Sequence, residues 1–216
     1  MRRAYDLIIF DCDGVIVDSE VIGNRVFRQF LAELGLELTE QQVYERFLGR
    51  ALADSLVIIE GLLGHPVPLA SLERYKRKRD ETLRNEVRAV EGVTEIIRAL
   101  TVPFCVASSG DHDKMRATLG ATGLLSLFDG RIFSAVDVAR AKPAPDVFLH
   151  AAGAMQTDPS RTAVIEDTVN GVTAARAAGM TVYGYASLTS AEKLTEAGAH
   201  MTFAHMRELE DLLGLH

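Results

Sequence analysis

The feature that most restricts the fold of this chain is a regular alternation of short apolar runs with helical patterns. The apolar runs resemble strands buried on both faces and span 6–10, 103–109, 130–135, 162–167 and 180–186. Helical patterns separate the later runs, at 93–100, 112–124, 145–155 and 170–179. Strands that alternate with helices indicate βαβ units. We therefore expect an α/β fold built on a doubly wound, mainly parallel sheet.

The segment 18–88 departs from this alternation because it contains helical patterns alone. An apolar stripe predicts a first helix, which Asp18 or Ser19 can cap and Gly35 ends. The sequence TEQQ at 39–42 predicts a capping box for a second helix, and two more helices are expected at 52–63 and 69–88. No repeat or low-complexity linker divides the chain. We expect an α/β core formed by 1–17 and 89–216, with 18–88 as a helical cap inserted after the first strand.

Composition narrows the kinds of partner. The chain has 216 residues, of which 48% are hydrophobic and 25% charged, so it can bury a substantial core. Its formal net charge of −7 does not favour nucleic acid or an anionic membrane as a partner. The N-terminus lacks a signal-peptide core and no apolar run approaches a membrane span, so we expect a cytoplasmic protein, monomeric or weakly dimeric. Cys12 and Cys105 lie in apolar runs and are expected to be free, buried thiols.

Polar side chains follow four of the predicted strands. They are Asp11 and Asp13, Ser108 and Ser109, Lys142, and Glu166 with Asp167. Parallel strands place their carboxyl ends at one edge of the sheet, and open α/β sheets bind ligands outside that edge. We therefore expect these side chains to converge on one site.

The chemistry of this set suits a metal ion and a phosphoryl group. Asp11, Asp13 and Asp167 offer hard oxygen ligands, which Mg²⁺ combines with water and substrate phosphate oxygens. Without a cation these carboxylates would repel one another. Lys142 adds positive charge, and the Ser108 hydroxyl can donate to phosphate oxygens. Phosphoryl transfer depends mainly on positioning and charge neutralisation, so the set predicts a small phosphorylated metabolite as substrate.

Taken singly, several of these residues allow simpler interpretations. The sequence D-x-D-G could form a turn or half of a calcium loop, although Gly14 comes too early for an EF-hand and no helix precedes it. Ser108 could only cap the next helix, and Lys142 could be a solvated loop residue. Glu166 could support the site without touching a metal ion.

Four segments, in order, resemble the motifs of the haloacid dehalogenase-like superfamily: DCDGVIVDSE, VASSG, KPAPDVF and VIEDTVNGVTAARAAGM. The closest branch is that of the β-phosphoglucomutase-like phosphatases, which carry a helical cap after the first motif. The resemblance covers nearly the whole chain. It implies a Rossmann-like core and a Mg²⁺-dependent phosphatase that hydrolyses a small phosphomonoester, of the sugar phosphate or phosphoglycolate type, through an aspartyl-phosphate.

The resemblance also implies roles for single residues. Asp11 would be the nucleophile, and Asp13 the acid that protonates the leaving oxygen and then the base that activates water. Phosphate would be held by Ser108, Ser109 and Lys142. The metal site would use Asp11, the Asp13 carbonyl and Asp167, with Glu166 as a ligand or a nearby acceptor.

The cap offers two candidate substrate residues. The run YKRKRDE at 75–81 is typical of a solvated helix face, yet the β-phosphoglucomutase pattern has a substrate-facing lysine near this place. Lys78 matches that lysine best, and Arg50 is a second candidate.

Other functions share these motifs. A phosphosugar mutase is the first alternative, although Gly23 stands where the mutase pattern has a cap histidine and Leu52 where it has a cap arginine. A phospho-accepting signalling domain is the second, although Asp13 would hydrolyse its phosphoaspartate and a cap would be superfluous. A dehalogenase has no use for the second acid, and a phosphonatase normally replaces it.

Overall fold

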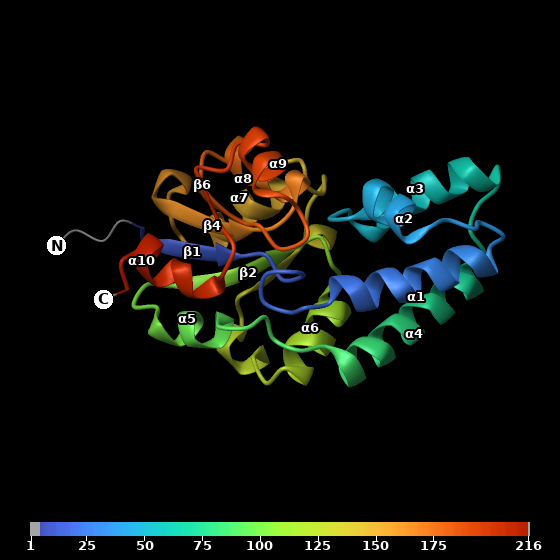
Figure 1. Cartoon of the computed structure of the whole chain (residues 1–216), viewed down its shortest axis with the longest axis horizontal. Coiled ribbons are helices and arrows are strands. Elements are labelled where there is room, and N and C mark those ends of the chain that lie inside the picture. Colours follow the sequence, from blue (N-terminus) through green and yellow to red (C-terminus); the bar gives the residue numbers. More distant parts are fainter. Residues whose placement is uncertain (1–4, 216) are drawn as a thin grey trace.

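The computed structural model describes residues 5–215, and its centre is a six-stranded β-sheet (Figure 1). The strands lie in the order β3-β2-β1-β4-β5-β6, and each neighbouring pair is parallel. Their bounds are β1 (Leu7–Phe10), β2 (Phe104–Ser108), β3 (Ile132–Ser134), β4 (Thr162–Glu166), β5 (Thr181–Tyr185) and β6 (Met201–Phe203). The expected doubly wound, Rossmann-like α/β fold is confirmed.

Helices cover both faces of this sheet (Figure 1). They are α5 (Val93–Ala99), α6 (His112–Ala121), α7 (Asp146–Ala154), α8 (Val169–Ala177), α9 (Ala191–Glu196) and α10 (Leu209–Leu213). No element is predicted after 186, where the structure has α9, β6 and α10, because such short elements contain too few residues to show a period. Within residues 5–215, no helix is both long and apolar enough to cross a membrane.

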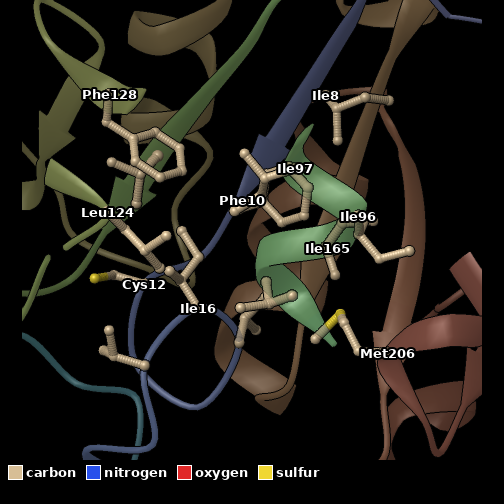
Figure 2. Packing of buried hydrophobic residues seen from close by; sticks show 14 of the residues in the cluster. Ile8, Phe10, Cys12, Ile16, Ile96, Ile97, Leu124, Phe128, Ile165 and Met206 are labelled. Carbon is tan, nitrogen blue, oxygen red and sulfur yellow. The ribbon is translucent and has the colours of Figure 1, made fainter. Parts of the chain in front are cut away.

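Successive side chains of β1 pack on opposite faces of the sheet, each in a different apolar cluster. Leu7 and Ile9 pack in one buried cluster with residues of α7 and α8, while Ile8 and Phe10 pack in the other with residues of α5 and α6. Figure 2 shows the second cluster, in which Phe10 lies close to Ile97. Successive side chains of a strand point to opposite faces, so a central strand with helices on both sides must be apolar throughout. Cys12 and Cys105 are free and buried, as expected.

Four helices lie between β1 and α5 and form a separate body beyond the carboxyl end of the sheet (Figure 1). They are α1 (Glu20–Glu33), α2 (Glu40–Phe47), α3 (Leu52–Leu63) and α4 (Leu69–Glu86). They enclose an apolar cluster of their own, in which Phe30 stacks on Tyr75 with ring centroids 4.6 Å apart. The predicted capping box of α2 is present, since Thr39 accepts a hydrogen bond from the Gln42 main chain.

The chain enters and leaves these four helices through two adjacent segments. The Asp18 amide donates to the Arg88 carbonyl at 2.9 Å, and the Val90 amide donates to the Ile16 carbonyl at 3.0 Å. Two short crossings that lie side by side are a natural place for one body to move relative to another. The division into a core of 1–17 and 89–216 and a cap of 18–88 remains a proposal, which these crossings and the separate apolar cluster support.

Candidate active site

A cavity of about 520 Å³ lies at the carboxyl end of the sheet, between the core and α1–α4. It adjoins β1 and β4, where the order of the strands reverses and open α/β sheets bind their ligands. From the core side it is lined by Asp11, Asp13, Ser108, Ser109, Lys142 and Glu166. The predicted convergence of the strand ends is therefore present in the structure.

The Lys142 ammonium group is the centre of the core side. Its Nζ donates to Asp11 Oδ1 at 2.5 Å, to Glu166 Oε1 at 2.8 Å and to the Ala107 carbonyl at 3.1 Å. An ammonium has three donors, so all of them are used. Lys142 is only 2% exposed, and its Nζ also lies 4.6 Å from the centroid of the Phe148 ring. A lysine eight residues beyond the end of β3 thus reaches back into the sheet edge rather than into solvent.

Asp13 is held at both carboxylate oxygens. The Ser19 hydroxyl donates to Oδ1 at 2.5 Å, and Lys114 Nζ lies 2.8 Å from Oδ2. Burial raises the pKa of Asp13, but the Lys114 ammonium and the Ser19 hydrogen bond outweigh it and lower the pKa below its usual value. Ser19 occupies the N-cap position of α1 without a side-chain bond to the helix, so its hydroxyl serves Asp13 instead of the cap we expected.

Gly14 allows the first motif to approach the fourth. Its φ is +77°, a conformation that glycine adopts without strain. A Cβ atom at this position would lie 2.1 Å from Asp167 Oδ2. Glycine is therefore required both by the backbone conformation and by the closeness of the two acidic loops.

Burial and mutual repulsion raise the pKa values of two carboxyl groups at and just below the floor of the cavity. Burial, together with the neighbouring Glu166 and Asp13, raises the pKa of Asp11 to about 8, although Lys142 opposes the shift. Burial and the same kind of repulsion, from Glu166 and Asp11, raise the pKa of Asp167 well above its usual range. One ammonium group does not balance three buried carboxyl groups, so the site favours a further cation.

The donor set fits a small divalent ion. Asp167 Oδ1 is buried and has no hydrogen-bond partner, so it is free to bind a cation. Within residues 5–215, no three histidine, cysteine or acidic side chains are grouped as a metal site. An ion here would use two carboxylates, those of Asp11 and Asp167, with main-chain oxygen and water. Mg²⁺ accepts such a set, because it commonly keeps several waters and binds through one or two carboxylates.

Glu166 is already saturated by protein donors. Its Oε1 accepts from Lys142, and its Oε2 accepts from the Thr168 amide at 2.9 Å and the Thr168 hydroxyl at 3.0 Å. A Cβ atom on Gly171 would lie 1.7 Å from Oε1, so α8 can pack against this carboxylate only through a glycine. Of the two roles predicted for Glu166, these contacts favour a nearby acceptor that orients Lys142 over a direct metal ligand.

The two serines after β2 have different surroundings. Ser108 is 1% exposed, and its hydroxyl accepts from the Gly110 amide at 3.0 Å. Its lone hydroxyl proton remains available toward the cavity, and the N-cap of α6 is Asp111 instead. The Ser109 hydroxyl donates to the Gly49 carbonyl at 3.1 Å, which joins the core to the loop after α2. A phosphate contact from Ser109 would have to exchange this bond, so its predicted role stays a prediction.

The structure separates the two cap candidates. Arg50 lines the cavity, and its Nε donates to the Arg46 carbonyl at 2.8 Å. Lys78 is exposed and lines a smaller pocket outside the cavity, between α1 and α4. Neighbouring residues of a helix are about 100° apart, so the burial of Arg79 turns Lys78 away from the site. Of the charged residues in the same run, Lys76 and Arg79 are the ones that reach the cavity.

Arg79 and Lys114 belong to the site although the sequence analysis did not single them out. Arg79, on α4, is 5% exposed; its Nε lies 2.7 Å from Asp80 Oδ1 and its Nη2 lies 3.0 Å from Asp111 Oδ2. Asp111 is the N-cap of α6, and its Oδ1 accepts from the Lys114 amide at 2.8 Å. Its carboxylate therefore joins α4 to the helix that carries the lysine on Asp13. The only sequence signal was a lysine three residues after a possible N-cap.

Glu20, at the start of α1, also lines the cavity. Burial, and then the negative charge of Asp13, raise the pKa of its carboxyl group to about 7. This residue lies next to Ser19 and extends the polar surface of the site from the core onto the first cap helix.

Comparison with known proteins identifies the class of this arrangement. The chain belongs to the haloacid dehalogenase-like hydrolases, whose family model matches residues 5–179. The matched region begins before β1 and ends after α8, so it contains all four segments that carry the resemblance except Met180, the last residue of the fourth. The chain is accordingly an enzyme of the hydrolase class, and the predicted superfamily is confirmed.

Among individual relatives, the 6-phosphogluconate phosphatase of Escherichia coli (strain K12) is 33% identical over 210 residues, which cover 96% of this chain and 94% of that protein. A haloacid dehalogenase-like protein from Agrobacterium tumefaciens has 35% identity and a TM-score of 0.80, with 97% and 98% of the two chains covered. A family hydrolase from Deinococcus radiodurans, solved with phosphate and sodium, has 31% identity and a TM-score of 0.75, with 99% and 98% covered. These similarities agree with a phosphomonoester hydrolase.

The link between Arg79 and Asp111 gives a prediction on stability. We expect Asp111→Asn to lower the free energy of unfolding at pH 7 by about 1–3 kcal/mol, since asparagine keeps the N-cap but loses the charged hydrogen bond. Although burial raises the pKa of Asp111, Arg79 lowers it below its usual value. The stabilisation is therefore present above the unfolded pKa of about 3.8 and is lost as the pH falls through the lower folded value.

Urea unfolding of Asp111→Asn and wild type at pH 7 and at pH 3 measures this effect. The matched control is Glu86→Gln, which removes an exposed pair with Arg25 and should change little at either pH. A deficit of the same size at both pH values would mean that Asp111 acts through packing or capping and not through its charge.

Proposed function

We propose that this chain is a Mg²⁺-dependent phosphatase that hydrolyses small phosphorylated sugars through an aspartyl-phosphate on Asp11. The observation that carries the proposal is the pairing of two buried carboxylates with two ammonium groups at one cavity: Asp11 with the buried Lys142, and Asp13 with the partly exposed Lys114. A dianionic phosphate can enter such a site because cations already surround the acids that would act on it. The similarity to a 6-phosphogluconate phosphatase supports a phosphorylated sugar as the substrate.

In the first step an Asp11 carboxylate oxygen attacks the phosphorus atom, and the bond between phosphorus and the sugar oxygen breaks. Asp13 donates its proton to the departing oxygen, which leaves as an alcohol. Lys114 keeps Asp13 ionised before substrate binds, and the negative charge of an arriving phosphate raises the pKa of Asp13 so that it takes up this proton. Lys142 orients Asp11 and neutralises charge on the phosphoryl oxygens.

In the second step the roles reverse at Asp13. Its carboxylate removes a proton from a water molecule, the water oxygen attacks the phosphorus atom of the aspartyl-phosphate, and the bond to Asp11 breaks. Inorganic phosphate leaves and Asp11 regains its carboxylate. One residue serves as acid and then as base because the leaving alcohol and the attacking water occupy the same side of phosphorus.

The proposed Mg²⁺ would be held by the side chains of Asp11 and Asp167 and by the Asp13 carbonyl. When bound, it supplies positive charge that offsets repulsion between the carboxylates and the phosphoryl oxygens. The unpartnered Asp167 Oδ1 supports this assignment. Glu166 would fix Lys142 through Oε1 and the loop before α8 through Oε2. A cytoplasmic location and a monomeric or weakly dimeric state remain predictions.

The first prediction concerns the nucleophile. Asp11→Asn keeps the size of the side chain but removes the attacking charge, so we expect kcat to fall by at least a thousandfold while the far-UV circular dichroism is unchanged. Phosphate release from 6-phosphogluconate measures kcat. Asp13→Asn should slow both steps and allow the phosphorylated protein to be detected by intact mass, which Asp11→Asn should never show. An Asp11→Asn protein with a tenth of wild-type kcat would contradict the assignment.

The second prediction concerns the metal. Activity should disappear in excess EDTA and return when Mg²⁺ is added, whereas Ca²⁺ should inhibit because its larger, looser coordination shell misplaces the nucleophile and phosphorus. Asp167→Ala should raise the Mg²⁺ concentration required or abolish activity. It should also remove the increase in melting temperature that Mg²⁺ gives the wild type. Full activity in excess chelator would rule the metal site out.

The third prediction separates the phosphatase from a phosphosugar mutase. A mutase must protect its aspartyl-phosphate from water until a sugar is bound, and Gly23 has no side chain with which to delay Asp13. We therefore expect β-glucose 1-phosphate, where accepted, to give glucose and free phosphate, with little glucose 6-phosphate even in the presence of a bisphosphate primer. A phosphorus NMR time course distinguishes the products. Stoichiometric glucose 6-phosphate without free phosphate would favour the mutase.

The same experiment bears on the signalling alternative. A phospho-accepting domain would form the aspartyl-phosphate once and hold it, so phosphate release would stop near one equivalent per protein. Asp13 and a cavity between the core and α1–α4 favour repeated turnover.

A further inference from the structure

The first turns of α1 form part of the cap wall of the cavity. Glu20, Gly23 and Asn24 all line it. Residues four positions apart lie on one face of a helix, so Glu20 and Asn24 present a carboxyl group and an amide to the same side, with Gly23 beside them. None of the three belongs to the catalytic steps described above.

Asn24 carries a buried amide with an unsatisfied hydrogen-bond acceptor. It is 8% exposed, and its Oδ1 has no hydrogen-bond partner. Within residues 5–215 only one other buried side-chain atom lacks a partner, Asp167 Oδ1 at the proposed metal site. Buried polar atoms without hydrogen-bond partners are unfavourable, and the other side chains in 5–215 have none. An apolar side chain would suit the stability of α1 better, since the next turn of the helix carries Phe27, which packs in the apolar cluster of the cap.

Gly23 is a second residue that does not favour stability. Glycine in the interior of a helix is less favourable than alanine, because it has more backbone freedom to lose. Packing does not require it, since a Cβ atom built on Gly23 would meet nothing within 4 Å. Its φ is not among the positive values that demand glycine. The residue leaves open space on the cavity wall next to the unpartnered amide.

We propose that α1 recognises the hydroxyl groups of a polyhydroxylated phosphomonoester, with the Asn24 amide bonding a substrate hydroxyl and Gly23 leaving room for the carbon chain. A hydroxyl is both donor and acceptor, and the amide can present oxygen or nitrogen after a half-turn of χ2 with no change of volume. The inference rests on the proposed phosphatase function and specifies its substrate class. A chain without hydroxyls would leave the amide unpaired and would be rejected, which is how buried polar groups give specificity.

The test uses two six-carbon substrates that differ in their hydroxyl groups, sorbitol 6-phosphate and n-hexyl phosphate. In the wild type kcat/KM should favour sorbitol 6-phosphate. Asn24→Leu keeps the volume and removes the amide, so the ratio of the two kcat/KM values should fall tenfold or more. The melting temperature should stay the same or rise, because an unpartnered polar group has been removed. Ser55→Ala is the matched control: Ser55 is buried at the same cavity, but its hydroxyl already donates to the Ala51 carbonyl at 3.1 Å.

Gly23→Leu tests the space separately. It should lower kcat/KM for both six-carbon substrates by a similar factor and leave their ratio unchanged, while Asn24→Leu changes the ratio. An unchanged ratio in Asn24→Leu, or a lower melting temperature with equal losses on both substrates, would make Asn24 a structural residue and overturn the inference alone. A wild-type protein that releases phosphate from neither compound would instead overturn the proposed function on phosphorylated sugars.

Discussion

A single buried ammonium group ties together the polar ends of three strands. Lys142 Nζ contacts Asp11 after β1, the Ala107 carbonyl of β2 and Glu166 at the end of β4. These strands are neighbours in the sheet, so the lysine spans the point where the strand order reverses. Removing one partner of such a buried group typically costs about 3–5 kcal/mol, because the remaining charges are left uncompensated. The position of Asp11, the proposed nucleophile, therefore depends on the same contact that stabilises the sheet edge.

The second acid depends on contacts from outside the sheet. Asp13 receives one hydrogen bond from Ser19, at the entrance to the cap, and one ion pair from Lys114 on α6. The helix that carries Lys114 is joined to α4 through Arg79 and Asp111. Asp11 is thus fixed by the core alone, whereas Asp13 is fixed where core and cap meet. A movement of the cap would therefore disturb Asp13, the proposed acid and base, before it disturbed Asp11, the proposed nucleophile.

The sequence predicts the strands and the polar residues that follow them well. It does not predict which charged residues of a helix face the cavity. Short apolar runs ending in acids predicted the strands, the edge where they end and the gathering of Asp11, Asp13, Lys142 and Asp167 there. The run at 75–81 has six charged residues, and nothing local shows which of them face the site. The pattern therefore favours Lys78, whereas Lys76 and Arg79 are the ones that reach the cavity. Lys114 was missed because its partner, Asp13, is distant in the sequence and meets it only through tertiary packing.

Several residues that disfavour stability lie at or beside the cavity between the core and α1–α4. Close to its floor, the buried Asp167 has an unpartnered oxygen, and at the floor burial and repulsion raise the pKa of Asp11. On the cap wall, Asn24 has an unpartnered oxygen, and Gly23 is a glycine within a helix that packing does not require. Residues that lower folding stability are expected at functional sites, because selection there acts on binding and chemistry. The proposed cation would relieve the conflicts at the floor, and a substrate that carries hydroxyl groups would relieve those at the wall. One substrate that carries both a phosphate and hydroxyl groups would extend from the floor to the wall and satisfy both.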